Sequence, residues 1–216
     1  MNAEFRKFKK NWIRRWKDRE IGFHGNEINP LLKNHFHSLN IHNASKVFIP
    51  LCGKSLDISW LLSEGYYVVG VELSEDAVKE LFEELGLTPV ISKTDDFIEY
   101  KTNNVCVFAG DIFNLSFDLL GTIDAIYDRA ALVALPKEVR IEYARHLIRI
   151  TKVAPQLLIS YEYDQKLMSV SPFSVDSSEI AEHYNNHYSP SLLEKEDIKG
   201  GLKGEVDAKQ TVWLLQ

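Results

Sequence analysis

The sequence has 216 residues, of which 45% are hydrophobic and 26% charged, and its formal net charge at pH 7 is -6. A chain of this length and apolar content folds around a core, which excludes a disordered or collagen-like polymer. The net acidity argues against a protein whose main task is to wrap nucleic acid, because that task needs a basic face. No apolar run approaches the roughly 20 residues needed to cross a bilayer.

The first twenty residues predict a basic amphipathic helix. Its aromatic residues recur at three- and four-residue spacing, and they are Phe5, Phe8, Trp12 and Trp16. Lysine and arginine residues are interleaved with them. This stripe is typical of a helix docked on the core, or of a lid that closes a site. A membrane-surface or transit segment and a nucleic-acid patch are the alternatives.

An alternation of helices and strands follows this helix. We expect strands at 46–50, 66–72, 105–109, 122–127, 156–160 and 210–215, and short irregular β structure at 88–100. We expect helices at 30–39, from about 56 to 65, 74 to 86 and 136 to 151, and at 179–187. This order predicts an α/β fold with a doubly wound, mostly parallel, seven-stranded sheet and helices on both faces. The last strand is expected to be antiparallel.

No linker or repeat divides the chain, so we expect one domain over 1–216, with a helical cover over 1–40 and the α/β core over 45–216. Cys52 and Cys106 do not support a disulfide framework. The first residues lack the apolar core and cleavage site of a secretory signal. We therefore expect a cytoplasmic protein.

The turn after the first strand reads Pro50-Leu-Cys-Gly-Lys-Ser55. A phosphate-binding loop needs a glycine five positions before Gly53, where Phe48 stands inside the strand. The dinucleotide fingerprint is also absent, because Gly53 is the one glycine of this turn. A pyrophosphate would therefore lack its usual cradle.

Acidic residues follow three of the predicted strands. Ligands of an open α/β sheet bind beyond the carboxyl ends of its strands. Glu72 ends the second strand about twenty residues after the turn, where a carboxylate accepts hydrogen bonds from the ribose hydroxyls of an adenosine cofactor. Asp111 and Ile112 suit an adenine, and Asp128-Arg129 follow the next strand. The set favours S-adenosylmethionine over a dinucleotide, and the alternative for Glu72 is a solvated strand-end acid.

Four segments carry a specific pattern, with Trp12 and Phe23-His24 upstream: Phe48-Ile-Pro-Leu-Cys-Gly-Lys54, Val69-Gly-Val-Glu-Leu-Ser74, Gly110-Asp-Ile-Phe113 and Tyr127-Asp-Arg-Ala-Ala-Leu-Val133. In order and spacing, the chain resembles the thiopurine S-methyltransferase family from about residue 12 to 175. The resemblance implies a Rossmann-like class I methyltransferase fold with an N-terminal helical lid. It also implies S-adenosylmethionine as methyl donor and S-adenosylhomocysteine as product.

By this resemblance, the cofactor-binding positions are Trp12, Leu51, Glu72, Asp111, Ile112 and Arg129. The positions expected to border the methyl acceptor are Phe23, Arg129 and Phe173. Trp12 would close over the cofactor and exclude water. Arg129 would meet the methionine carboxylate or an anionic acceptor. No residue is assigned as catalytic, because an acceptor thiol with a pKa near or below 7 needs no strong base.

The chain departs from the family pattern before its last strand. Members of the family carry an arginine- and aromatic-containing segment there, whereas this chain has Ile198-Lys-Gly-Gly-Leu-Lys-Gly204. A lysine supplies charge but not a planar fork. The acceptor therefore stays open between an aromatic or heterocyclic thiol and a small hydrosulfide, halide, selenium or tellurium species.

Other candidate chemistry is weak. His35-x-His37 and His183-x-x-x-His187 have no matching third ligand, so no metal site is expected. Neither cysteine has a neighbouring motif that would activate it. We therefore predict an S-methyltransferase that acts on a small molecule as a monomer, with no nucleic-acid or membrane partner. The alternatives are a non-catalytic S-adenosylmethionine-binding protein and a nucleic-acid-binding module that uses the basic helix.

Overall fold

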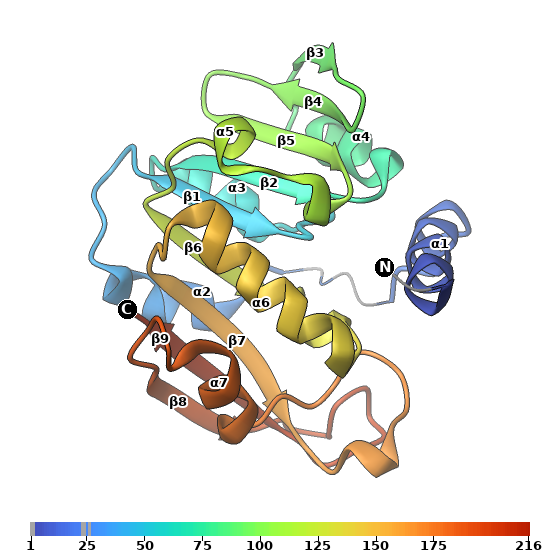
Figure 1. The fold of residues 1–216 in the computed structure, drawn as a ribbon, viewed down its shortest axis with the longest axis vertical. Helices are drawn as coiled ribbons and strands as arrows, with labels where there is room; N and C mark the ends of the chain where they lie inside the picture. The colour runs from blue at the N-terminus through green and yellow to red at the C-terminus, as the bar shows by residue number, and fades with distance from the viewer. Residues whose placement is uncertain (1–2, 23–24, 26) are drawn as a thin grey trace.

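The computed structural model of the protein describes residues 3–22, 25 and 27–216. Over these residues it forms one nine-stranded sheet (Figure 1). In spatial order the strands are β3 (Val90–Lys93), β4 (Phe97–Lys101), β5 (Val105–Gly110), β2 (Tyr67–Glu72), β1 (Lys46–Pro50), β6 (Ala125–Arg129), β7 (Gln156–Glu162), β9 (Lys209–Leu215) and β8 (Ser191–Asp197).

The five central strands, from β5 through β2, β1 and β6 to β7, pair in parallel. Antiparallel pairs extend the sheet at each edge, β3 with β4 on one side and β9 with β8 on the other. The predicted doubly wound parallel core and the antiparallel last strand are confirmed. The strand count exceeds seven because residues 88–100 form a regular hairpin and because β8 adds an outer strand. Neither β3 nor most of β8 is buried, so neither shows the apolar pattern that predicts a strand.

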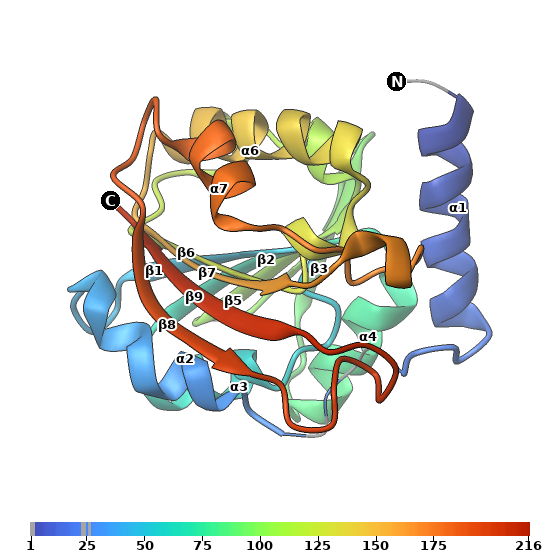
Figure 2. The ribbon, with the colours of Figure 1, turned by 90° about the horizontal axis from the view of Figure 1, so that it is seen from below.

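Helices cover both faces of the sheet (Figure 2). One face carries α5 (Phe117–Leu120), α6 (Lys137–Thr151) and α7 (Ser177–Tyr184), and the other carries α2 (Pro30–His35), α3 (Asp57–Ser63) and α4 (Glu75–Glu84). Short 3-10 turns lie at η1 (Phe36–Leu39), η2 (Ile112–Asn114), η3 (Leu132–Ala134) and η4 (Gln165–Leu167). The central strands are buried on both faces, which explains why they read as continuous apolar runs.

The helices α4 and α2 begin at residues whose side chains cap the first turn. The Ser74 side chain accepts a hydrogen bond from the Ala77 amide at 3.3 Å, and acidic residues fill the first turn of α4. The Asn29 side chain caps α2 in the same way, and Pro30 occupies its first turn. These caps fix where α2 and α4 start, and the cap at Ser74 stands two positions after the end of β2 at Glu72.

The helix α1 (Ala3–Lys17) stands apart from the layers, beyond the carboxyl ends of the parallel strands (Figures 1 and 2). Its Phe5 and Trp16 side chains are buried. The Phe5 ring packs edge-on against Phe113, with ring centroids 5.5 Å apart. The predicted N-terminal helix is therefore confirmed. It packs on the rest of the protein through its aromatic residues. In the part of the chain that the structure describes, no helix has the length and apolar character of a membrane span.

Candidate active site

A cavity of about 510 Å³ lies between α1 and the carboxyl ends of the parallel strands. An open α/β sheet binds its ligands in this place, where strand order reverses. The aromatic stripe of α1 forms one wall through Phe5, Phe8, Trp12 and Trp16. The opposite wall comes from the residues that follow the strands.

Because β2 and β7 lie on opposite sides of β1, the strand ends divide the cavity into two parts. We call one part the β2 end; it is lined by Leu51, Gly53, Glu72, Asp111 and Ile112. We call the other part the β7 end; it is lined by Val133, Ala134, Leu135, Tyr161, Ser171, Pro172, Leu202 and Lys203. Arg129, at the end of β6, lies between them in the sheet order.

The structure brings together all six residues predicted to bind the cofactor, since each lines this cavity: Trp12, Leu51, Glu72, Asp111, Ile112 and Arg129. Phe173 does not line it, although its neighbour Pro172 does. The Phe173 ring instead faces the Arg140 guanidinium at 5.8 Å, because its backbone amide is bound to the Val133 carbonyl. Phe23 and His24 lie outside the described residues.

The turn after β1 has an unusual backbone. Leu51 and Gly53 both have positive φ, +47° and +52°. A left-handed conformation at leucine costs about 1–3 kcal/mol, and such strain gathers at ligand-binding sites. A Cβ at Gly53 would lie 3.0 Å from the Trp16 ring, so glycine lets α1 approach the turn closely.

Glu72 is fixed by the backbone of this turn. Its carboxylate accepts hydrogen bonds from the Gly53 amide and from the Ser74 amide, both at 2.9 Å. The residue is 6% exposed, and burial raises the pKa of the carboxyl while these backbone amides oppose the rise. A carboxylate has about four acceptor sites, so the Glu72 carboxylate retains capacity to accept from a bound hydroxyl.

Asp111 links the β2 end to α1. One oxygen accepts the Phe113 amide at 3.1 Å and so begins η2, while the other is paired with the Lys9 ammonium of α1. Just after α1, another ion pair joins Arg19 to Glu80 of α4 at 2.6 Å. Ion pairs on α1 and just after it therefore help its aromatic rings to hold the helix over the cavity.

Asp57 is a site-supporting residue that the sequence did not single out. Its carboxylate is 0% exposed and accepts the Asn29 amide at 2.8 Å and the Tyr127 hydroxyl at 2.9 Å. Its second oxygen also lies 3.5 Å from Arg129 Nη1. In the sequence this aspartate resembles any first-turn acid of a helix, and only the fold brings it to Arg129.

Arg129 retains an unused donor. Its Nε is buried and has no hydrogen-bond partner among the residues that the structure describes. A buried donor without an acceptor costs about 1–3 kcal/mol. Because Arg129 lines the cavity, an anionic ligand there could satisfy it.

The divergent segment at 198–204 forms a tight turn at the β7 end. Gly201 has a φ of +77°, and a Cβ there would lie 2.8 Å from the Val206 carbonyl oxygen. Leu202 pairs with Val206, and Lys203 then faces the cavity and donates to the Ser171 carbonyl. Burial lowers the pKa of Lys203, and the nearby Arg15 lowers it further. Two positive charges thus gather on this side of the cavity.

The two cysteines are poor nucleophiles. Burial raises the pKa of Cys52 well above its ordinary value, and burial with the neighbouring Glu99 raises the pKa of Cys106 to about 12. Two of the four histidines noted in the sequence contact carboxylates, His35 with Glu194 and His183 with Glu179. Over the described residues, no group of three or more potential ligands could hold a metal ion.

The sequence matches the model of the thiopurine S-methyltransferase (TPMT) family over residues 8–213. The chain belongs to the thiopurine S-methyltransferase family. It is 50% identical to the thiopurine S-methyltransferase of Teredinibacter turnerae, over 94% of this chain and 95% of that protein. It is 46% identical to the thiopurine S-methyltransferase of Xanthobacter autotrophicus, over 95% of this chain and 97% of that protein. The resemblance seen in the sequence is confirmed.

A solved structure supports the fold independently. The Burkholderia thailandensis 1,6-didemethyltoxoflavin-N1-methyltransferase, with bound 1,6-didemethyltoxoflavin and S-adenosylhomocysteine, superposes with a TM-score of 0.68. The alignment covers 100% of this chain and 92% of that one at 14% identity. The predicted class I methyltransferase fold of this thiopurine S-methyltransferase family member is therefore confirmed.

Proposed function

We propose that the protein transfers the methyl group of S-adenosylmethionine to the sulfur of a thiopurine or of a similar aromatic or heterocyclic thiol. Membership in the thiopurine S-methyltransferase family supports this reaction. The observation that carries the proposal is one cavity that joins a carboxylate-bearing end to a cationic end beneath an aromatic helix.

The β2 end fits an adenosine cofactor. The Glu72 carboxylate, held in place by backbone amides, keeps acceptor capacity for the ribose hydroxyls. Asp111 and Ile112 supply a carboxylate and an apolar surface for the adenine, and Leu51 supplies backbone groups. When bound, S-adenosylmethionine supplies a sulfonium methyl group, whose bond to sulfur breaks as the acceptor sulfur's electron pair forms the new sulfur–carbon bond.

The β7 end fits an ionised acceptor. Arg129 and Lys203 place positive charge on the cavity wall, which favours the thiolate over the thiol. The thiol proton is then lost to solvent before transfer, and no side chain has to remove it in the transition state. Trp12 and the other rings of α1 exclude water, so that positioning and desolvation supply the rate. The aromatic lining also suits a planar heterocycle.

The second candidate is a smaller acceptor, such as hydrosulfide, a halide, or a selenium or tellurium anion. The observation in its favour is Lys203, which stands in the segment where family members carry an arginine and aromatic residues. A lysine is a point charge that does not match a planar partner bidentately.

The test is methyl transfer from labelled S-adenosylmethionine to 6-mercaptopurine by the purified protein, with a no-acceptor control. Parallel reactions contain hydrosulfide or a selenium anion in place of the purine. Transfer to 6-mercaptopurine supports the thiopurine assignment. Transfer to the inorganic anions alone supports the second candidate. Binding of S-adenosylhomocysteine without transfer to any acceptor would contradict both and leave a cofactor-binding protein.

A further inference from the structure

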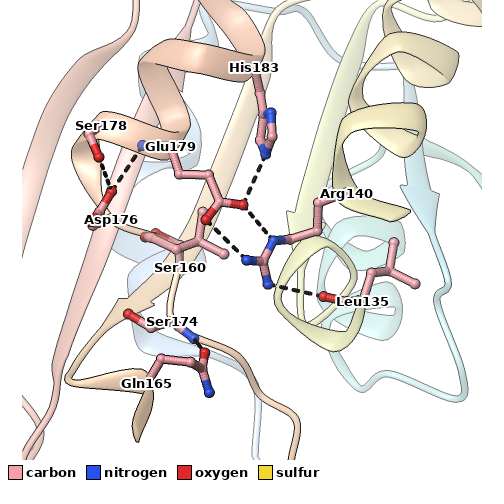
Figure 3. A network of polar contacts seen from close by, with 10 residues as sticks. Leu135, Arg140, Ser160, Gln165, Ser174, Asp176, Ser178, Glu179 and His183 are labelled. Carbon is pink, nitrogen blue, oxygen red and sulfur yellow. Dashed lines mark hydrogen bonds and ion pairs between the residues drawn. The ribbon is translucent and has the colours of Figure 1, made fainter. Parts of the chain in front are cut away.

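A buried ion-pair network lies outside the cavity, between α6 and α7 (Figure 3). Arg140 Nε and Nη2 donate to the two carboxylate oxygens of Glu179 at 2.6 and 3.0 Å. The side chains of Arg140 and Glu179 are 4% and 9% exposed. His183 Nε2 lies 3.0 Å from the same carboxylate, from the next turn of α7. We call Arg140, Glu179 and His183 the α6–α7 clamp.

Stability alone is a weak reason for this network. The desolvation cost of burying two charges offsets much of their attraction, and apolar replacements of similar volume are often neutral or stabilising. What the pair does supply is orientation. A planar guanidinium bound at two points by a carboxylate is held in one geometry, which an apolar contact would not impose.

The clamp holds two segments of the cavity wall. Arg140 Nη1 donates to the Leu135 carbonyl at 3.0 Å, and Figure 3 shows this contact extending away from Glu179. The guanidinium carbon also faces the Phe173 ring at 5.8 Å. The Phe173 amide in turn donates to the Val133 carbonyl at 2.6 Å. Arg140 therefore ties residues 133–135 to residues 172–173.

Both segments belong to the β7 end. Val133, Leu135 and Pro172 line the cavity there, whereas Arg140, Glu179 and His183 do not line it. The β2 end lies across β1 in the sheet and is held by other contacts, chiefly the backbone amides around Glu72. A change in the clamp should thus move the β7 end and leave the β2 end in place.

We propose that Arg140, held by Glu179 and His183, is a positioning residue for the wall that receives the methyl acceptor. This inference rests on the proposed function, in which the acceptor occupies the β7 end. Arg140 touches neither ligand in this proposal. It acts through Leu135 and Phe173, so its loss should change acceptor affinity while cofactor affinity stays constant.

The test is a double variant, Arg140→Met with Glu179→Met, which removes the pair without leaving a buried charge. The matched control is Arg145→Met with Glu142→Met, which removes an exposed ion pair from the same helix. Thermal unfolding and S-adenosylhomocysteine affinity are measured first for the wild type and both variants. The KM and kcat for 6-mercaptopurine, or for the best acceptor of the wild type, follow.

The expected result for the clamp variant is a rise in acceptor KM of about tenfold, because small misplacements of a substrate are costly. S-adenosylhomocysteine affinity should stay within about twofold, a change too small to count as a lost contact. Arg140→Lys, which retains the charge but not the fork, should fall between wild type and double variant. The control should match the wild type.

Three outcomes would overturn the inference. An unchanged acceptor KM in a folded clamp variant would show that the wall needs no clamp. An equal loss of acceptor and S-adenosylhomocysteine affinity would show a general structural role. If the wild-type protein methylates no acceptor although it binds S-adenosylhomocysteine, the proposed function fails, and the inference fails with it. The wild-type assay separates this last case from the first two.

Discussion

At the β2 end of the cavity Glu72 is fixed by backbone amides close to it in the sequence, whereas at the β7 end the residues that line the cavity come from segments far apart in the sequence. Glu72 is held by two amides from the turn after β1 and the start of α4. Lys203, in contrast, reaches the cavity from a glycine-rich turn and is held by the Ser171 carbonyl. The β7 end depends on several loops that can change independently, whereas the contacts of Glu72 lie within one βαβ unit and the turn after it. We therefore expect substitutions to alter the β7 end more readily than the β2 end.

The largest expected effect is at Asp57, which supports Arg129 between the two ends. Asp57→Ala leaves the Asn29 amide and the Tyr127 hydroxyl without their acceptor and leaves Arg129 without its counter-charge. We expect the free energy of unfolding to fall by about 3 kcal/mol. Urea unfolding measures it. Asp57→Asn keeps an acceptor oxygen and should lose less. If Asp57→Ala were as stable as the wild type, the fold would not depend on the contacts that Asp57 makes.

Glu72 tests the β2 end. Glu72→Ala should weaken S-adenosylhomocysteine binding by about 1–3 kcal/mol, the scale of hydrogen bonds to a charged group. Calorimetric titration measures the affinity. Glu84→Ala, which removes an exposed carboxylate that pairs with Lys54, is the matched control and should bind as the wild type does. Unchanged affinity in Glu72→Ala would remove this residue from the cofactor site.

Lys203 tests the β7 end. Lys203→Gln should raise the KM of an anionic thiol about fivefold, equivalent to about 1 kcal/mol, because one positive charge leaves the acceptor wall. S-adenosylhomocysteine affinity should not change. Lys199→Gln, in the same turn but not part of the cavity lining, is the control. Steady-state kinetics measure the KM of the thiol for each variant. An equal rise of this KM in both variants would argue against a specific role for Lys203.

The smallest expected effect concerns α1. Lys9→Met removes the ion pair with Asp111, which is mostly shielded from solvent, and should weaken closure of the helix by about 0.5–1 kcal/mol. A faster release of S-adenosylhomocysteine in stopped-flow experiments would report this. The neighbouring Lys10→Met changes an exposed residue of the same helix and should release the product at the wild-type rate. Equal release rates for wild type and Lys9→Met would show that the aromatic rings alone hold α1.

The sequence by itself determined the parallel core, its helices and the residues of the β2 end. These depend on local patterns: continuous apolar runs for buried strands, capping residues such as Ser74, and Glu72 at a fixed distance from the turn after β1. Each pattern lies within one βαβ unit, so its residues come together whenever that unit folds.

The long-range contacts that support Arg129 and the β7 end could not be predicted from the sequence. The Asp57–Arg129 contact joins residues 72 positions apart in the sequence, and the pair formed by Arg140 and Glu179 joins residues 39 apart. Phe173 was placed in the acceptor wall by resemblance, and its ring faces Arg140 instead. Such contacts leave no periodic signal, because they arise where separate strand ends and loops meet after the sheet has assembled. The physical reason is that long-range side-chain pairs are set by packing geometry and not by local propensity.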